Sequence, residues 1–256
     1  MRRAAVALGR IRSLGARLVL TMTAVGIAGA IAITLMLAGV ITPSFRQLER
    51  RAVNNQVERT QVALAHYSAD LESTVRDFGD WNAGYDYLES RDRAFEEETA
   101  SPRSLANFGI DGLAFIDNER RILIARWINE MHDRPATRAA FVAQLGQMDL
   151  SRMLGDRHSV SFYARFGETV AAVGLARVRR SDGTGTPRGF IVMARTMTAA
   201  RLSELLGTDA VITPAVGQPP VDRVTASRMT ITVPFPGAGG EAVSYTHLTL
   251  PTKRIV

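Results

Sequence analysis

The chain has 256 residues, with 31 basic and 25 acidic side chains and no cysteine. The absence of cysteine excludes disulfides, thiolate metal ligands and a cysteine nucleophile. The formal charge of +6 comes from the ends, because five arginines precede residue 18 and two more basic residues, Lys253 and Arg254, lie near the last residue. The remainder is nearly balanced and has no basic run with interleaved aromatic residues, so we expect no nucleic-acid partner.

An uncharged apolar run from Leu18 to Ile41 indicates a membrane protein. A helix rises about 1.5 Å per residue, so this run is long enough to cross a hydrocarbon core of roughly 30 Å. The arginines before it predict a cytoplasmic leader at residues 1–17 and an extracytoplasmic location for the chain beyond Pro43. A cleaved signal peptide is the alternative, but the apolar run continues about ten residues past its small-residue site. We therefore predict a transmembrane helix at 18–41, in a lipid bilayer.

Beyond Pro43 the sequence predicts a long helix. Apolar residues recur every seven positions, as in a coiled coil. They are Val57, Leu64, Leu71 and Phe78, with Val53, Tyr67 and Val75 near companion positions. This stripe is either the seam of a homodimer or the face that packs on the protein's own sheet. Several companion positions are polar, so both interpretations stay open.

The body that follows reads as strands and helices separated by glycine-rich or polar turns. The predicted elements are strands 112–116 and 121–126 in a hairpin, a helical segment 135–154, strands 159–166, 169–178 and 189–195, a helix 199–206, and strands near 210–212 and 229–233. This order predicts an α+β domain over residues 44–242, an antiparallel sheet with helices on one side.

The segment from residue 77 to residue 88 is the best candidate for ligand binding. Trp81 and Tyr85 fall on one face of a helix, with Asp77 and Asn82 close by, and such a set can line a pocket. Aromatic residues at helical spacing also pack helices onto sheets, which is the alternative. Arg126 could pair with a carboxylate ligand. The candidate ligand-binding residues are Asp77, Trp81, Asn82, Tyr85, Asn107 and Arg126.

The sequence predicts no catalytic constellation. The histidines are scattered, and neither a phosphate-binding glycine loop nor a nucleophile elbow is present. We therefore expect no metal, no cofactor and no enzyme activity in this chain. The rival interpretations are a membrane-anchored periplasmic enzyme and a structural anchor without a ligand pocket.

Three motifs carry a resemblance to a known family. They are W-N-x-x-Y-x-Y from Trp81, A-N-F-G-I-D from Ala106 and A-F-I-D-N-E-R-R-I-L from Ala114. Together they resemble the CHASE domain of type four, a periplasmic sensor domain of bacterial receptors. The resemblance implies a PAS- or Cache-like fold and an unknown small-molecule ligand. It also implies a cytoplasmic output, most often a diguanylate cyclase or cyclic di-GMP phosphodiesterase (GGDEF or EAL domain), less often a histidine kinase or chemoreceptor.

The chain departs from the family pattern at two places. Asn82 and Ala83 replace an acidic pair, which puts a carboxylate-based ligand contact there in doubt. Glu119 and Arg120 stand where the hairpin of the family has its glycine.

The last segment, residues 243–256, is predicted to be foreign to the native protein. Its first ten residues resemble a translated frame of a transposon-end adapter used for sequencing libraries, and the only lysine of the chain lies within the segment. A segment of this origin is not part of the native fold, so the predicted domain ends at residue 242. We expect the native chain to continue from about Ala242 toward a second membrane helix and an output domain.

Overall fold

The computed structural model describes residues 14–37, 39, 42–129, 131–214, 223–224, 228–239 and 241–251. The chain divides into two compact units, Met1–Gln56 and Val57–Val256. Helix α1 (Leu14–Met36) belongs to the first unit, and helix α2 (Thr42–Gly79) begins there and continues into the second.

Helix α1 is long and apolar enough to cross a membrane, and within the described residues no other helix is. Its side chains are exposed, as expected for a surface that faces lipid rather than a protein core. The hydroxyls of Thr21, Thr23 and Thr34 each donate to a backbone carbonyl oxygen one turn earlier. The three polar side chains are thus satisfied inside the helix, as a hydrocarbon environment requires. The helix begins and ends a few residues before the predicted bounds of 18–41.

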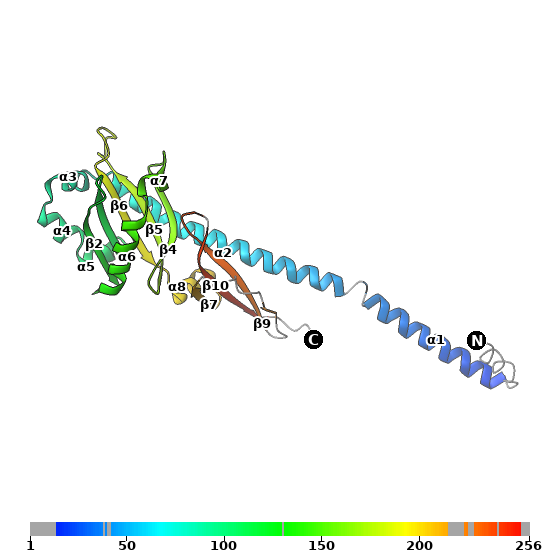
Figure 1. Ribbon diagram of the computed structural model, residues 1–256. Coiled ribbons are helices and arrows are strands. Elements are labelled where there is room, and N and C mark those ends of the chain that lie inside the picture. The colour runs from blue at the N-terminus through cyan, green and yellow to red at the C-terminus, as the bar shows by residue number, and fades with distance from the viewer. Residues whose placement is uncertain are drawn as a thin grey trace. The chain divides into compact units, whose positions relative to one another are not determined.

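The second unit is an α+β domain with two antiparallel sheets (Figure 1). In order across the first sheet, its strands are β3 (His132–Asp133), β2 (Ile122–Asn129), β1 (Gly112–Asp117), β6 (Gly189–Thr196), β5 (Thr169–Val178) and β4 (Ser159–Phe166). The second sheet has the order β7 (Ala210–Pro214), β10 (Ala242–Pro251), β9 (Arg228–Pro236) and β8 (Arg223–Val224). The shorter helices are α3 (Asn82–Ser90), α4 (Arg93–Thr99), α5 (Pro102–Asn107), α6 (Pro135–Gln147), α7 (Leu150–Leu154) and α8 (Ala199–Leu206).

Helix α2 packs along one face of the first sheet. Leu64, Leu71 and Val75 of its apolar stripe are fully buried. Gly174 of β5 permits this close approach, since a Cβ atom there would lie 2.8 Å from Val75 Cγ1 and 3.1 Å from the Leu71 carbonyl oxygen. From Leu64 onward, the stripe is therefore the face that packs on the protein's own sheet.

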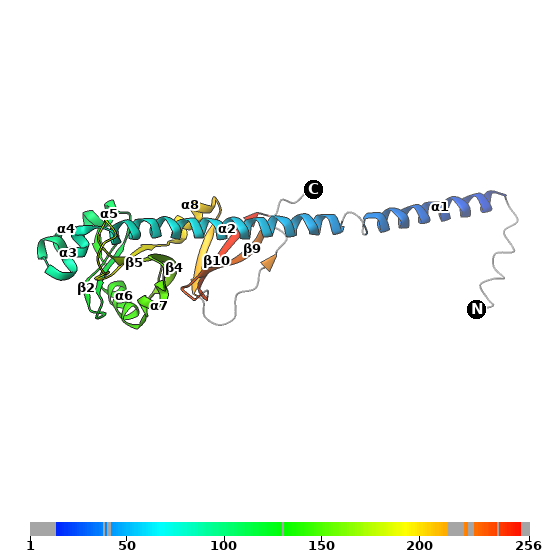
Figure 2. The ribbon, with the colours of Figure 1, turned by 90° about the horizontal axis from the view of Figure 1, so that it is seen from above.

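Helices α6 and α7 cover the opposite face, as Figure 2 shows. Trp127, Phe141 and Phe166 meet there edge to face, with ring centroids 5.1 to 5.2 Å apart. The expectation of helices on one side only was wrong. The central strands β5 and β6 are buried almost throughout, so they carry apolar side chains on both faces and need a cover on each.

Two further expectations need correction. The helical segment 135–154 is two helices, because Met148 adopts an extended conformation and the Asp149 carboxylate then accepts the Arg152 N–H to cap α7. The strands near 210–212 and 229–233 belong to a separate second sheet. That sheet touches the first through Tyr163 and Phe235, whose ring centroids lie 5.1 Å apart.

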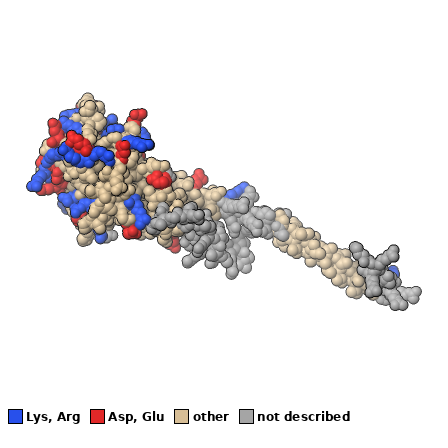
Figure 3. Space-filling model, in the orientation of Figure 1, with Lys and Arg blue, Asp and Glu red and all other residues tan. Residues whose placement is uncertain are grey.

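Strand β10 lies between β7 and β9 and coincides with most of the segment at 243–256. The foreign origin of that segment stays a prediction. Across the visible face of the folded domain, basic and acidic side chains are intermixed (Figure 3).

Candidate functional site: an aromatic cleft after the long helix

The candidate site lies where α2 ends and α3 begins. Gly79 ends α2 in contact with β5, and a Cβ atom there would lie 2.6 Å from the Arg177 carbonyl oxygen. Trp81 then takes an extended conformation, with φ −88° and ψ 121°, as the residue that precedes α3. The chain therefore turns sharply, and the indole packs edge-on against Phe78, one turn back, at 5.6 Å between centroids.

Four residues line an open apolar cleft of about 390 Å³ at this turn: Asp77, Phe78, Trp81 and Phe108. Phe78 also packs edge-on against Phe108, with centroids 4.5 Å apart. Trp81 keeps 43% of its surface exposed, which leaves part of its ring free to contact a ligand. Aromatic faces beside one carboxylate can hold a flat apolar group that carries a positive charge.

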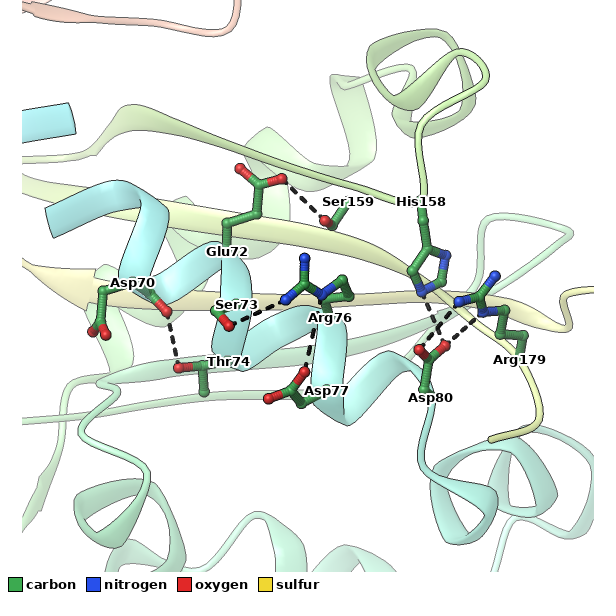
Figure 4. A network of polar contacts seen from close by, with 10 residues as sticks. All are labelled: Asp70, Glu72, Ser73, Thr74, Arg76, Asp77, Asp80, His158, Ser159 and Arg179. Carbon is green, nitrogen blue, oxygen red and sulfur yellow. Dashed lines mark hydrogen bonds and ion pairs between the residues drawn. The ribbon is translucent and has the colours of Figure 1, made fainter. Parts of the chain in front are cut away.

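Asp77 is the only charged group that lines the cleft among the described residues. Its side chain is 74% exposed and lies 3.9 Å from the Arg76 guanidinium, which is too long and too exposed to be a strong pair. In Figure 4 Asp77 points toward Arg76 and away from Asp80. Its carboxylate is therefore available at the rim.

The structure brings together only some of the residues predicted from the sequence. Asp77 and Trp81 line the cleft. Asn107 is exposed and precedes Phe108 in the chain, but it does not line the cleft. Arg126 is exposed on β2 and lies outside the cleft.

Asn82 and Tyr85 face the turn between β5 and β6 instead of the cleft. The Asn82 side-chain oxygen accepts the Ser181 N–H at 3.1 Å, and the Tyr85 hydroxyl donates to the Thr186 carbonyl oxygen at 3.3 Å. The Arg188 guanidinium lies 4.0 Å from the centroid of the buried Tyr85 ring. Both residues therefore hold this turn in place. The expectation that Trp81 and Tyr85 share a helical face was wrong, because Trp81 precedes α3.

Phe78 and Phe108 line the cleft but were not among the residues predicted to bind a ligand, although Phe108 belongs to the A-N-F-G-I-D motif. Phe78 was assigned to the apolar stripe of α2, of which it is the last member. Phe108 directly precedes Gly109, whose φ of +63° ends α5 and returns the chain to the sheet. Its position beside Phe78 in the cleft depends on this turn, and no periodicity in the sequence reveals it.

A cluster of polar side chains holds the end of α2 in place (Figure 4). Asp80 accepts two hydrogen bonds from the Arg179 guanidinium, at 2.6 and 3.2 Å, and lies 3.0 Å from His158 Nε2. Burial opposes ionisation of Asp80, but the Arg179 hydrogen bond and the neighbouring positive charge outweigh it, so the pKa of Asp80 is lowered. Burial, followed by repulsion from Arg179, lowers the pKa of His158. The cluster ties α2 to the start of β4 and the end of β5.

The motif that begins at Ala114 forms the β1–β2 hairpin and stabilises the fold. Asp117 accepts the backbone N–H groups of Glu119 and Arg121 at 3.0 and 2.8 Å, and its other oxygen pairs with the guanidinium groups of Arg91 and Arg121. Burial alone would raise the pKa of Asp117, but these hydrogen bonds and charges lower it. Since Asp117 is buried and fully engaged, it is a structural residue of the turn.

The chain matches the family model of the CHASE4 domain over residues 63–211. No curated protein matches it in sequence. Two crystal structures of the periplasmic domain of Vibrio cholerae LuxQ are similar to it, with TM-scores of 0.54 and 0.52 at 10% and 11% identity. They cover 78% and 79% of this chain and 100% of the LuxQ domain. The sensor domain of the Vibrio cholerae histidine kinase DctB reaches a TM-score of 0.47 at 8% identity, with 80% of this chain and 98% of that chain covered.

The LuxQ likeness concerns the fold, since the identity is low. It confirms the PAS- or Cache-like α+β architecture implied by the three motifs. The family match covers α2 from residue 63, the whole first sheet and α8. The chain therefore belongs to the CHASE4 domain family, and its folded part has the architecture of a bacterial periplasmic sensor domain.

Proposed function

We propose that this chain is the input part of a membrane-anchored receptor and that the Trp81 cleft binds the small molecule that the receptor senses. The observation that carries this proposal is the position of the cleft. It is lined by the last turn of α2, and α2 is the segment that leads back along the chain to α1. The family, the fold and the apolar helix α1 support the same function.

The mechanism needs two positions of α2 with different affinities for the ligand. Asp77 and Phe78 belong to α2, whereas Phe108 follows α5. A ligand held between these residues favours the position of α2 that brings them to the right spacing. The brace of Asp80, His158 and Arg179 then passes that shift to β4 and β5.

The proposed output is cytoplasmic: a diguanylate cyclase or cyclic di-GMP phosphodiesterase, or in second place a histidine kinase or chemoreceptor module. The arginine-rich leader supports a cytoplasmic N-terminus in the bacterial inner membrane. The chain is proposed to act as a homodimer and to have no enzyme activity of its own. A membrane-anchored periplasmic enzyme and a ligand-free anchor are the rivals. The cleft does not support the enzyme, because its lining holds a single carboxylate, and it does not support the anchor, because an anchor needs no cleft.

Protection of Trp81 from a quencher tests the cleft directly. The chain has two tryptophans, and Trp127 is only 1% exposed, so acrylamide quenching reports on Trp81. Benzyltrimethylammonium is a suitable probe, because its ring matches the aromatic lining and its charge matches Asp77. We expect this probe to protect Trp81 in the purified full chain.

Three variants test whether the protection of Trp81 comes from binding in the cleft. Phe108→Ala should abolish protection and Asp77→Asn should weaken it, because one removes a wall of the cleft and the other removes its charge. Asn107→Ala is the matched control and should behave like the wild type. Equal protection in Phe108→Ala, or none in the wild type, would contradict the proposal.

A further inference from the structure

A second hollow of about 530 Å³ lies at the end of the first sheet, beside α8. Its floor comes from the ends of three adjacent strands. Asp111 directly precedes β1, and Asn129 and Thr196 are the last residues of β2 and β6, the two neighbours of β1 in the sheet. Its rim is formed by α8 and the residue before it: Thr198, Ala200, Arg201 and Glu204. We call this hollow the junction pocket, because α8 connects the first sheet to the second.

The polar groups of the junction pocket are largely unused by the protein. Within the described residues, the Asn129 amide, the Arg201 guanidinium and the Glu204 carboxylate have no hydrogen-bond or ion-pair partner. The nearby Arg195 is occupied, since it donates to the Gly109 carbonyl oxygen at 2.6 Å and pairs with Asp70 at 2.8 Å. Opposite charges on the rim therefore remain available to a bound molecule.

Asp111 supplies the charge at the floor. It accepts the Thr196 backbone N–H at 2.6 Å, and no basic group pairs with it in the described part of the chain. Burial raises its pKa, although the backbone hydrogen bond from Thr196 and the positive charges of Arg201 and Arg195 act in the other direction. A half-buried carboxylate without its own cation is costly to the fold and is typical of a binding site.

We propose that the junction pocket binds a small zwitterion, with its cationic nitrogen at Asp111 and Glu204 and its anionic group at Arg201. Asn129 can bond to either end, because its amide both donates and accepts. A simple anion would face two carboxylates, and a simple cation would leave the guanidinium unpaired. The volume lies in the range typical of small-molecule sites. This site shares no lining residue with the Trp81 cleft and goes beyond the function proposed for that cleft.

The pocket also touches α2. The Tyr67 hydroxyl donates to the Thr196 carbonyl oxygen at 3.4 Å, and the Arg201 guanidinium lies 5.7 Å from the centroid of the Tyr67 ring. A zwitterion that draws Arg201 toward the floor therefore changes a contact of α2. The pocket would thus act on the same helix as the Trp81 cleft, from a different point along it.

Thermal unfolding of the purified full chain tests the proposal. The probes are glycine, β-alanine and 4-aminobutyrate, which separate the two charges by increasing distances, with propylamine and propionate as single-charge controls at matched ionic strength. We expect at least one zwitterion to raise the Tm in a concentration-dependent way while the single-charge ions, alone or mixed, do not. No shift with any of the three zwitterions, or an equal shift with the mixed single-charge ions, would overturn the proposal.

Four variants assign the shift to the pocket. Asp111→Asn keeps an acceptor for the Thr196 N–H and removes the half-buried charge, so the ligand-free Tm at pH 7 should stay equal or rise while the ligand shift disappears. Arg201→Gln should also lose the shift, and Arg103→Gln, an exposed arginine on α5, is the matched control that keeps it. Asp77→Asn should keep it as well, which separates this site from the Trp81 cleft. A full shift in Arg201→Gln would overturn the assignment.

Discussion

At the scale of single residues, Arg120 shows how the chain tolerates a departure from its family's pattern. Its φ of +66° lies in the left-handed region, where a glycine is favoured and where the family resemblance places one. The Arg120 guanidinium compensates by donating to the carbonyl oxygens of Gly146 and Met148, at 3.0 and 2.8 Å, at the end of α6. The departure was visible in the sequence, but its compensation was not, because it depends on where α6 ends.

Two substitutions of Arg120 separate strain from side-chain bonding. Arg120→Ala loses both hydrogen bonds and keeps the strained backbone, whereas Arg120→Gly loses the same bonds but relieves roughly 1 kcal/mol of strain. We therefore expect both variants to be less stable than the wild type in urea denaturation, with the alanine variant the less stable by about 1 kcal/mol. An alanine variant as stable as the glycine variant would show that the backbone at Arg120 is unstrained.

His158 gives the domain a pH dependence with a defined sign. Its pKa in the folded state is lowered from 6.5, so the unfolded chain binds the proton more tightly. Titration of His158 therefore does not change the free energy of unfolding above pH 6.5 and lowers it as the pH falls below that value. Urea midpoints measured from pH 7.5 to 5 should fall less in His158→Gln than in the wild type. His66→Gln, at an exposed position on α2, should follow the wild-type curve. Parallel curves for His158→Gln and the wild type would contradict this assignment.

At the scale of elements, the local sequence predicted where strands and helices lie better than it predicted which of them pack together. The bounds of β4, β5 and α8 agree with the prediction, because each element is apolar in pattern and bounded by turn or cap residues. Helix α5 and strand β3 were missed, since neither is long enough to show a period. The apolar stripe of α2 was recognised, but its role could be decided only by Gly174, which lies about a hundred residues later in the chain.

Because local sequence does not show which distant segments meet, only part of the candidate site was predicted. Trp81 and Asp77 were found from their own segment, whereas Phe108 and the floor of the junction pocket come from strand ends and turns that meet only after folding. Asn82 and Tyr85 were assigned to ligand binding because their partners, the turn residues Ser181 and Thr186, are distant in sequence.

Two glycines test the contact between α2 and the sheet with opposite expected signs. Gly174→Ala places a Cβ atom 2.8 Å from Val75 Cγ1 and 3.1 Å from a backbone oxygen of α2. We expect a loss of about 1–3 kcal/mol in the free energy of unfolding, as for an overpacked core. Gly146→Ala, at an open position of α6, should instead gain up to about 1 kcal/mol from helix propensity. Equal effects of the two changes in urea denaturation would mean that α2 does not need Gly174.

At the scale of the whole molecule, the chain couples a membrane helix to a domain with two sheets. The fold class and the antiparallel first sheet were predicted correctly from element order. The split into two sheets was not, because strand pairing joins residues that are distant in sequence and local patterns do not encode it. The two candidate pockets share no lining residue: one lies at the α2–α3 turn and the other at the strand ends beside α8.

Membrane topology is the prediction that belongs to this scale. The arginines before α1 predict that the N-terminus stays in the cytoplasm and that the folded domain crosses to the periplasm. Alkaline phosphatase fused near residue 200 should therefore be active in cells and remain in the membrane fraction, and β-galactosidase fused at the same point should be inactive. Active alkaline phosphatase in the soluble periplasmic fraction would instead identify α1 as a cleaved signal sequence, which the helix resembles in its position near the N-terminus. The reverse pattern of the two enzymes would place the domain in the cytoplasm. It would also remove the physical basis for sensing a periplasmic ligand, because both pockets would then face the wrong compartment.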